Sequence, residues 1–243
     1  MRGLGRYYEL TISYQGEIDP ATGYLHNVKG IDEAVRVYVL PYLEQCLAQA
    51  APGTGVPLGS ILQESLILLQ EPLGRHVQGL HLLLTPTYGI ELWKQNMEQV
   101  IIRQQFEFAA AHRLHASSLS DGENRQLFGK CNNPAGHGHN YRLEVAVRTP
   151  IDREGHVLTV QQLDDLVGRT VIDRLDHKHL NHDVSQFRHL NPSVENIAKV
   201  IWDMLVNKLD GLDKDSKPGS DLCQLEWISV WETDKTVCTY RGP

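Results

Sequence analysis

The segment Asn140-Tyr141-Arg142-Leu143-Glu144-Val145-Ala146-Val147-Arg148 alternates Tyr, Leu, Val and Val with Arg, Glu, Ala and Arg. Successive side chains of an extended chain point to opposite faces, so this period of two predicts a half-buried β-strand. The mixed apolar run Gln104 to His112 predicts another strand shortly before it. The second half of the chain therefore begins with a pair of strands.

Two amphipathic helices are expected after these strands. Apolar residues recur at helical spacing after the N-cap residue Thr159 and predict a helix from Val160 to Leu175. Asn191 followed by Pro192 is typical of an N-cap and a first helical residue. The apolar face that follows predicts a second helix, which runs to about Leu209.

The chain is expected to close with a β-hairpin. Gly211 to Ser220 is a polar segment and is interpreted as a loop. Leu222 to Thr233 and Lys235 to Tyr240 are rich in Trp, Val, Ile, Thr and Tyr, which favours two antiparallel strands. The predicted order is strand, strand, helix, helix, strand, strand, which is an α+β unit.

The first half of the chain repeats this pattern weakly. Tyr8-Glu9-Leu10-Thr11-Ile12-Ser13 is similar to Tyr141-Arg142-Leu143-Glu144-Val145-Ala146, an offset of 133 between positions 8 and 141. Pro57 to Gln70 then matches the second helix, and two short apolar runs match the closing strands. We interpret the chain as two tandem units, residues 1–100 and 101–243, although Met1 to Arg6 is too short to supply a first strand to the first copy.

Composition narrows the class of protein. The 243 residues include 23 Lys and Arg against 30 Asp and Glu, and the net charge of −7 disfavours a nucleic-acid-binding protein. Apolar runs fall short of the roughly 18 residues that a membrane helix needs, and Met1 to Tyr8 lacks the apolar core of a secretory signal. Four scattered cysteines are expected to be free thiols. These features predict a cytoplasmic protein with no nucleic-acid or membrane partner.

A metal site is indicated by three histidines. His137 and His139 stand two residues apart, which in an extended segment points both imidazoles to one face. His112, on the other predicted strand, is the candidate for a third nitrogen ligand. Three histidines with one open position are the ligand pattern of catalytic zinc.

Four further residues are candidates for chemistry. Cys131 lies in a polar, turn-forming stretch, where a nearby metal and Lys130 would favour the reactive thiolate; the alternative is an incidental free cysteine. Asp176 and His177 could relay a proton, or could be ordinary polar residues at a helix end. Glu232 could accept paired N–H donors from a planar heterocycle, or could be a solvated hairpin residue.

Taken together, these motifs resemble the 6-pyruvoyl-tetrahydropterin synthase family. The resemblance covers about Arg103 to Gly242 and is most specific in the run from Phe128 to Tyr141. The matching segments are Ala110-Ala111-His112-Arg113-Leu114, Phe128-Gly129-Lys130-Cys131-Asn132-Asn133-Pro134-Ala135-Gly136-His137-Gly138-His139-Asn140-Tyr141, Leu175-Asp176-His177, Asn191-Pro192-Ser193-Val194-Glu195-Asn196 and Trp231-Glu232-Thr233.

The resemblance implies a tunnelling fold, an antiparallel four-stranded sheet with two helices on one face, that assembles into barrels. It implies that His112, His137 and His139 bind Zn²⁺ and that Cys131 is the general base. It also implies that Asp176 and His177 complete the proton transfer and that Glu232 anchors the pterin. The implied substrate is 7,8-dihydroneopterin triphosphate, whose charge Arg113, Lys130 and Lys235 are expected to offset locally.

Other functions remain open on the sequence. The same residues could serve a 6-carboxy-tetrahydropterin synthase of queuosine biosynthesis, although the longer spacing between Cys131 and His137 favours the pyruvoyl type. A non-catalytic pterin or purine binder, or a structural zinc site with Cys131 as fourth ligand, are the alternatives from other classes.

The first copy lacks the motifs of the second. Glu44 and Gln45 stand at the positions of Asp176 and His177, and the first half has no Gly-His-Gly-His motif. We therefore expect a degenerate, inactive first unit. In a barrel made only of second copies, every interface joins two units that carry the site residues. Three chains can form such a barrel, with their three first copies as a second ring, so the chain is expected to form a homotrimer that resembles a hexamer of units.

Overall fold

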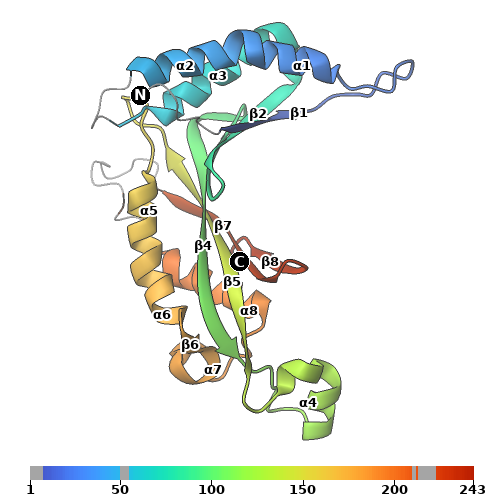
Figure 1. The fold of residues 1–243 in the computed structure, drawn as a ribbon, viewed down its shortest axis with the longest axis vertical. Helices are drawn as coiled ribbons and strands as arrows, with labels where there is room; N and C mark the ends of the chain where they lie inside the picture. The colour runs from blue at the N-terminus through green and yellow to red at the C-terminus, as the bar shows by residue number, and fades with distance from the viewer. Residues whose placement is uncertain (1–7, 50–54, 210–211, 213–222) are drawn as a thin grey trace, which may run out of the picture. The chain divides into compact units, whose positions relative to one another are not determined.

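The computed structural model describes residues 8–49, 55–209, 212 and 223–243. Backbone contacts divide them into two compact units (Figure 1). The first unit contains the chain up to Ile102 together with Arg148–Leu158, and the second contains Arg103–Val147 and Thr159–Pro243. The expected boundary after residue 100 treats the units as consecutive segments, whereas the contacts group Arg148–Leu158 with the first unit. Two long strands, β4 (Asn96–His112) and β5 (His137–Pro150), contribute residues to both.

The first unit has the strands β1 (Glu9–Tyr14), β2 (Val77–Thr85) and β3 (Tyr88–Trp93). They pair antiparallel in the order β1-β2-β3, and β4 follows β3 in the sheet. The segment expected to be too short for a first strand, Met1 to Arg6, lies outside the described residues. The beginning of β4 gives β3 a neighbour, so β3 is not an edge strand.

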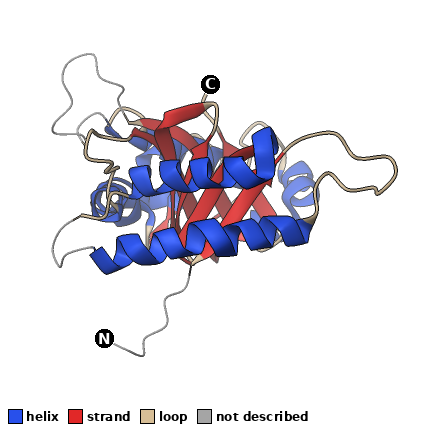
Figure 2. Cartoon of the chain, turned by 90° about the horizontal axis from the view of Figure 1, so that it is seen from above, coloured by secondary structure: helices blue, strands red, loops and turns tan. Residues whose placement is uncertain are grey.

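The helices of the first unit are α1 (Val28–Ala34), α2 (Leu40–Gln49) and α3 (Leu58–Leu73), with a π-helical turn at Val35–Val39 that joins α1 to α2. In Figure 2 this long composite helix and α3 lie side by side across the strands, and α3 contacts β2. Burial of Leu62, Leu66 and Leu69 on one face of α3 stabilises this packing. The first turn of α3 is capped by the Gly155 carbonyl, which accepts from Gly59 N at 3.0 Å.

The sheet of the second unit has the order β4-β5-β7-β8, where β7 is Gln224–Thr233 and β8 is Thr236–Tyr240. The two predicted strands at the start of this unit are confirmed, but both are longer than expected. The predicted closing hairpin is also confirmed, and β7 and β8 pair antiparallel. Apart from Leu212, the polar loop expected at Gly211 to Ser220 lies outside the described residues.

The first predicted helix of this unit is confirmed over its full length. It consists of α5 (Val160–Val167), a π-helical turn (Gly168–Ile172) and α6 (Asp173–Leu175). Thr159 caps it as expected, because its side chain accepts from Gln162 N. Buried Leu163, Val171 and Leu175 form its apolar face.

The second predicted helix has different ends from those expected. Helix α8 spans Val194–Leu205, and its N-cap is Ser193 rather than Asn191. The Ser193 hydroxyl accepts from Asn196 N, whereas the Asn191 side chain accepts from His115 N at 3.0 Å. The Asn191 side chain, which the sequence favoured as the cap, is therefore bonded to the backbone N–H of His115 instead, and the helix begins after Pro192.

Three short elements were not expected. Helix α4 (Asp121–Phe128) begins with a capping box between Ser120 and Glu123, a signal that the sequence contains. Strand β6 (Lys178–His179) pairs in parallel with the end of β4, and α7 (Leu180–Asp183) follows it. Strand β6 could not be predicted from periodicity, because a segment of two residues is too short to show a period.

The described residues contain no helix that combines the length and apolarity of a membrane span. The expectation of free thiols is confirmed, since Cys46, Cys131, Cys223 and Cys238 form no disulfide.

Candidate metal and catalytic site

The ends of two neighbouring strands position the three histidines. His112 is the last residue of β4, and His137 and His139 are the first and third residues of β5. The spacing of two places His137 and His139 on one face of the strand. The His112 ring centroid lies 4.5 Å from that of His137 and 5.2 Å from that of His139. The structure therefore brings together the three residues that the sequence singled out as metal ligands.

Glu232 joins this group from the end of β7. Its Oε1 lies 3.3 Å from His139 Nε2, and the two side chains are only 15% and 18% exposed. One ligand atom from each of His112, His137, His139 and Glu232 lies within 4.8 Å of the other three. Glu232 is thus a half-buried member of the cluster, which contradicts its alternative interpretation as a solvated hairpin residue.

The hydrogen bonds and burial of the histidines fit a bound cation. His112 Nδ1 donates to the Pro192 carbonyl at 2.7 Å, so in the neutral ring the lone pair is on Nε2. That Nε2 lies 3.1 Å from His137 Nε2. Burial is the main cause that lowers the pKa of His112 and of His139, which keeps both rings in the neutral form that binds metals.

Tyr141 lies beside this cluster and had no predicted role. It is fully buried on β5, its ring stacks on Phe108 at 4.9 Å, and its centroid lies 5.5 Å from that of His139. Burial, followed by the charges of Glu232 and Cys131, raises the pKa of the Tyr141 phenol. The phenol therefore stays protonated and forms an uncharged wall of the site.

Asp176 and His177 form a pair of their own. Asp176 Oδ2 accepts from His177 Nδ1 at 2.7 Å, and Asp176 Oδ1 accepts from Ala109 N at 2.7 Å. The Ala109 N–H and then His177 lower the pKa of the Asp176 carboxyl. His177 has a left-handed φ of 56° and a side chain that is 83% exposed. His177 and His139 line the same surface cavity, so the pair lies near the cluster without belonging to it.

Cys131 also lies outside the group of four. It is half-buried in the 3₁₀ turn Gly129–Asn132, and its carbonyl accepts from Leu114 N at 2.8 Å. This bond ties the turn to the chain that leaves β4 after His112. Of the cations expected to offset a triphosphate, Lys130 and Lys235 are exposed, and Arg113 donates to the Asn132 carbonyl at 3.1 Å.

Comparisons with known proteins find relatives of the part of the chain that holds this site. The family model described as 6-pyruvoyl tetrahydropterin synthase matches residues 101–243. The 6-pyruvoyl tetrahydrobiopterin synthase of Drosophila melanogaster is 44% identical over 137 residues, which are 56% of this chain and 76% of that protein. The Homo sapiens protein of that name is 38% identical over 145 residues, 59% of this chain and 92% of that one.

One solved structure supports the fold of the second unit. The 6-pyruvoyl tetrahydropterin synthase of Caenorhabditis elegans is 35% identical and superimposes with a TM-score of 0.51. The match covers 60% of this chain and 96% of the nematode chain. The curled antiparallel sheet with its helices is therefore a fold that this chain shares with that enzyme.

Proposed function

Since the chain belongs to the 6-pyruvoyl tetrahydropterin synthase family, we propose that it is a zinc-dependent lyase acting on 7,8-dihydroneopterin triphosphate. The products are 6-pyruvoyl-tetrahydropterin and triphosphate. The observation that carries the proposal is the convergence of three imidazoles and one carboxylate within 4.8 Å. A half-buried cluster of this composition suits a divalent metal and a substrate with exchangeable protons.

His112, His137 and His139 would hold the zinc ion through neutral imidazole nitrogens. When bound, zinc would supply Lewis acidity to the hydroxyls of the substrate side chain. The Pro192 carbonyl orients His112, because it accepts the Nδ1 proton and leaves Nε2 as the donor atom.

The remaining site residues transfer protons or bind the pterin. Cys131 is the general base that removes a proton from the substrate side chain, and this role requires its thiolate form. Asp176 orients His177 through the 2.7 Å hydrogen bond to Nδ1, which leaves His177 Nε2 to exchange a proton. Glu232 anchors the pterin, because a carboxylate can accept two parallel N–H donors.

A product assay tests the reaction and separates it from the runner-up. The purified protein is incubated with 7,8-dihydroneopterin triphosphate, with and without a trap for acetaldehyde, and the pterin formed is identified. 6-Pyruvoyl-tetrahydropterin is the expected product. 6-Carboxy-tetrahydropterin with trapped acetaldehyde would instead assign the chain to the queuosine branch, and binding without turnover would identify a pterin-binding protein.

Glu232→Gln should weaken the binding of a pterin analogue by about tenfold or more while the zinc content stays unchanged. An amide has only one acceptor oxygen, so one charge-assisted hydrogen bond is lost. Isothermal titration with metal analysis measures both quantities, and Glu195→Gln, an exposed carboxylate on α8, is the control. Loss of zinc in Glu232→Gln would make Glu232 a fourth ligand and contradict the anchor role.

The two units are the products of a duplication, and the first is degenerate. Each unit has a long helix interrupted by a π-helical turn, at Val35–Val39 and at Gly168–Ile172. Each also has a hairpin, β2-β3 and β7-β8, placed after its second long helix. These correspondences support two tandem tunnelling-fold units, in which residues 1–100 are inactive and residues 101–243 carry the chemistry.

We expect the chain to form a homotrimer. A ring of three catalytic units keeps each interface between like units, so that every neighbour supplies Asp176 and His177 rather than Glu44 and Gln45. Light scattering on active protein should give three times the mass of one 27.4 kDa chain. A mass of one or two chains in active material would contradict this assembly.

A further inference from the structure

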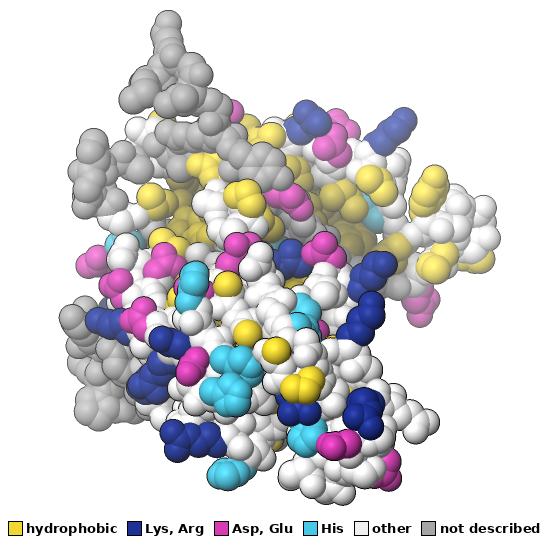
Figure 3. All heavy atoms as spheres, turned by 60° about the horizontal axis from the view of Figure 1, so that its bottom comes forward, with side chains coloured by type: hydrophobic (Ala, Val, Ile, Leu, Met, Phe, Trp, Pro, Cys, Tyr) yellow, Lys and Arg dark blue, Asp and Glu magenta, His cyan; other side chains and the backbone are white. Residues whose placement is uncertain are grey.

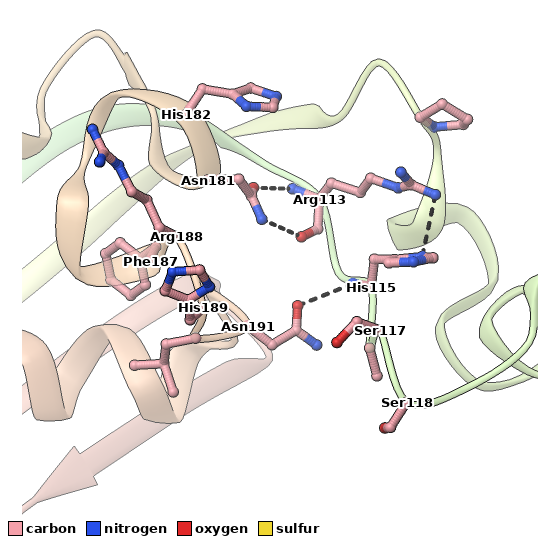
Figure 4. Close-up of a pocket in the computed structure, with 13 residues that line it drawn as sticks. Arg113, His115, Ser117, Ser118, Asn181, His182, Phe187, Arg188, His189 and Asn191 are labelled. Carbon is pink, nitrogen blue, oxygen red and sulfur yellow. Dashed lines mark hydrogen bonds between the residues drawn. The ribbon is translucent and has the colours of Figure 1, made fainter.

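A second cavity of about 550 Å³ lies in the second unit, and none of its lining residues, all of them described, belongs to the cluster of four (Figure 4). Two segments face each other across it. One is residues 113–118, which follow β4, and the other is residues 181–191, which contain the 3₁₀ turn Ser185–Phe187. The proposed reaction assigns no role to most of these residues.

The lining of this cavity is basic although the chain carries a net charge of −7. No Asp or Glu is among its lining residues, all of which lie in the described part of the chain. The neighbouring acid Asp183 is engaged elsewhere, because its Oδ2 accepts from His179 N at 2.7 Å. Figure 3, which brings the bottom of Figure 1 forward, shows His, Lys and Arg side chains on this face, with some Asp and Glu among them. The basic and imidazole residues of the cavity are Arg113, Arg188, His115, His182 and His189.

Asparagine side chains hold one wall of the cavity in place. Asn181 accepts from Arg113 N at 2.8 Å and donates to the Arg113 carbonyl at 3.0 Å, a two-point clamp visible in Figure 4. Asn191 accepts from His115 N, and Asn132 donates to the Leu114 carbonyl at 2.7 Å. A wall that is fixed before a ligand arrives lowers the entropic cost of binding.

The hydrogen bonds also determine what His115 can offer. Its Nδ1 lies 3.3 Å from Arg113 Nη2 and 3.1 Å from Asn132 Nδ2, and both of these groups are donors only. His115 Nδ1 must therefore accept, and its proton is on Nε2. The cavity thus combines two guanidinium groups, an imidazole N–H donor and the hydroxyls of Ser117 and Ser118, which are groups that bind phosphate oxygens.

We propose that this cavity is a binding site for a polyphosphate anion. The volume admits several phosphate groups, and the absence of carboxylates from its described lining removes the repulsion that the net charge of the chain imposes elsewhere. The ligand is either the polyphosphate tail of a substrate or a separate compound that carries the same group. The first of these alternatives rests on the proposed function and the second does not, and tripolyphosphate binding can be measured without pterin turnover.

Isothermal titration of the full chain with inorganic tripolyphosphate tests the site. Arg188→Gln removes one exposed cation of the lining and should weaken tripolyphosphate binding about tenfold or more. Arg153→Gln makes the same change at an exposed position outside the cavity, in the first unit, and should bind like the unchanged chain. No binding to the unchanged chain, or equal affinities of the two variants, would overturn the proposal.

Two further experiments identify where the anion binds and which compound it belongs to. Because polyphosphates chelate divalent metals, the titration is repeated on His137→Ala, which should retain the tripolyphosphate affinity. Loss of binding in His137→Ala with normal binding in Arg188→Gln would assign the anion to the histidine cluster and refute the site. Competition between tripolyphosphate and dihydroneopterin triphosphate identifies the substrate tail as ligand, and simultaneous binding identifies a separate compound.

Discussion

Replacing His137 by Ala should remove the bound metal and reduce turnover of dihydroneopterin triphosphate by at least about 100-fold. Loss of groups that only support metal ligands already costs ten- to a hundredfold in affinity or activity, and His137 would be a ligand itself. The three ring centroids lie 4.5, 4.8 and 5.2 Å from one another, so removing His137 leaves only two of the three converging imidazoles to hold an ion.

Metal content is measured by elemental analysis before and after dialysis against a chelator. His156→Ala is the matched control, because His156 belongs to the first unit and lies outside the cluster. Its metal content and turnover should equal those of the unchanged chain. A His137→Ala protein that retains one metal per chain and full turnover would show that the cluster is not the catalytic metal site.

Replacing Cys131 by Ala should leave the metal bound and reduce turnover by about 10² to 10⁴-fold, the effect of removing a general base. Loss of both metal and turnover in His137→Ala, and loss of turnover alone in Cys131→Ala, would therefore distinguish a metal ligand from a general base. Cys131→Ser should fail as well, because a hydroxyl of similar size does not ionise near neutral pH. A purely structural role for the side chain would instead be rescued by Ser.

Cys238→Ala is the control for this experiment. Cys238 is a half-buried thiol on β8, and burial raises its pKa, so it should be protonated and its removal should leave turnover unchanged. Full activity of Cys131→Ala would exclude Cys131 as the base. Loss of metal from Cys131→Ala would instead make it a zinc ligand and favour a closed structural site.

Local pattern predicted most of the secondary structure of the second unit. The alternation from Tyr141 to Arg148 lies within β5, and the helix from Val160 to Leu175 has the predicted ends. The error at Asn191 has a long-range cause, because His115 N occupies the side chain that was expected to cap α8. A rule based on neighbouring residues cannot detect a donor 76 positions away.

The sequence likewise predicted one part of the candidate site and not another. The i, i+2 spacing of His137 and His139 predicted that both point to one face, because a strand has a period of two. The pattern of strands and strand ends also singled out His112 and Glu232 as candidates, and the family resemblance assigned their roles. Neither predicted that the Glu232 carboxylate lies 3.3 Å from His139. That contact joins residues 93 positions apart, from 139 to 232, and arises only when β7 takes its place beside β5.

The sequence by itself determined the period of each strand and helix, the shared face of two histidines and the family of the second unit, because these depend on near neighbours in the chain. Only the tertiary structure decided that Pro192 orients His112, that Glu232 completes the cluster and that three asparagines, Asn132, Asn181 and Asn191, hold the chain after β4. These contacts depend on sheet order and on loops that return over many residues. The packing of the whole unit brings these distant segments together, and the periodicity of a short segment carries no information about it.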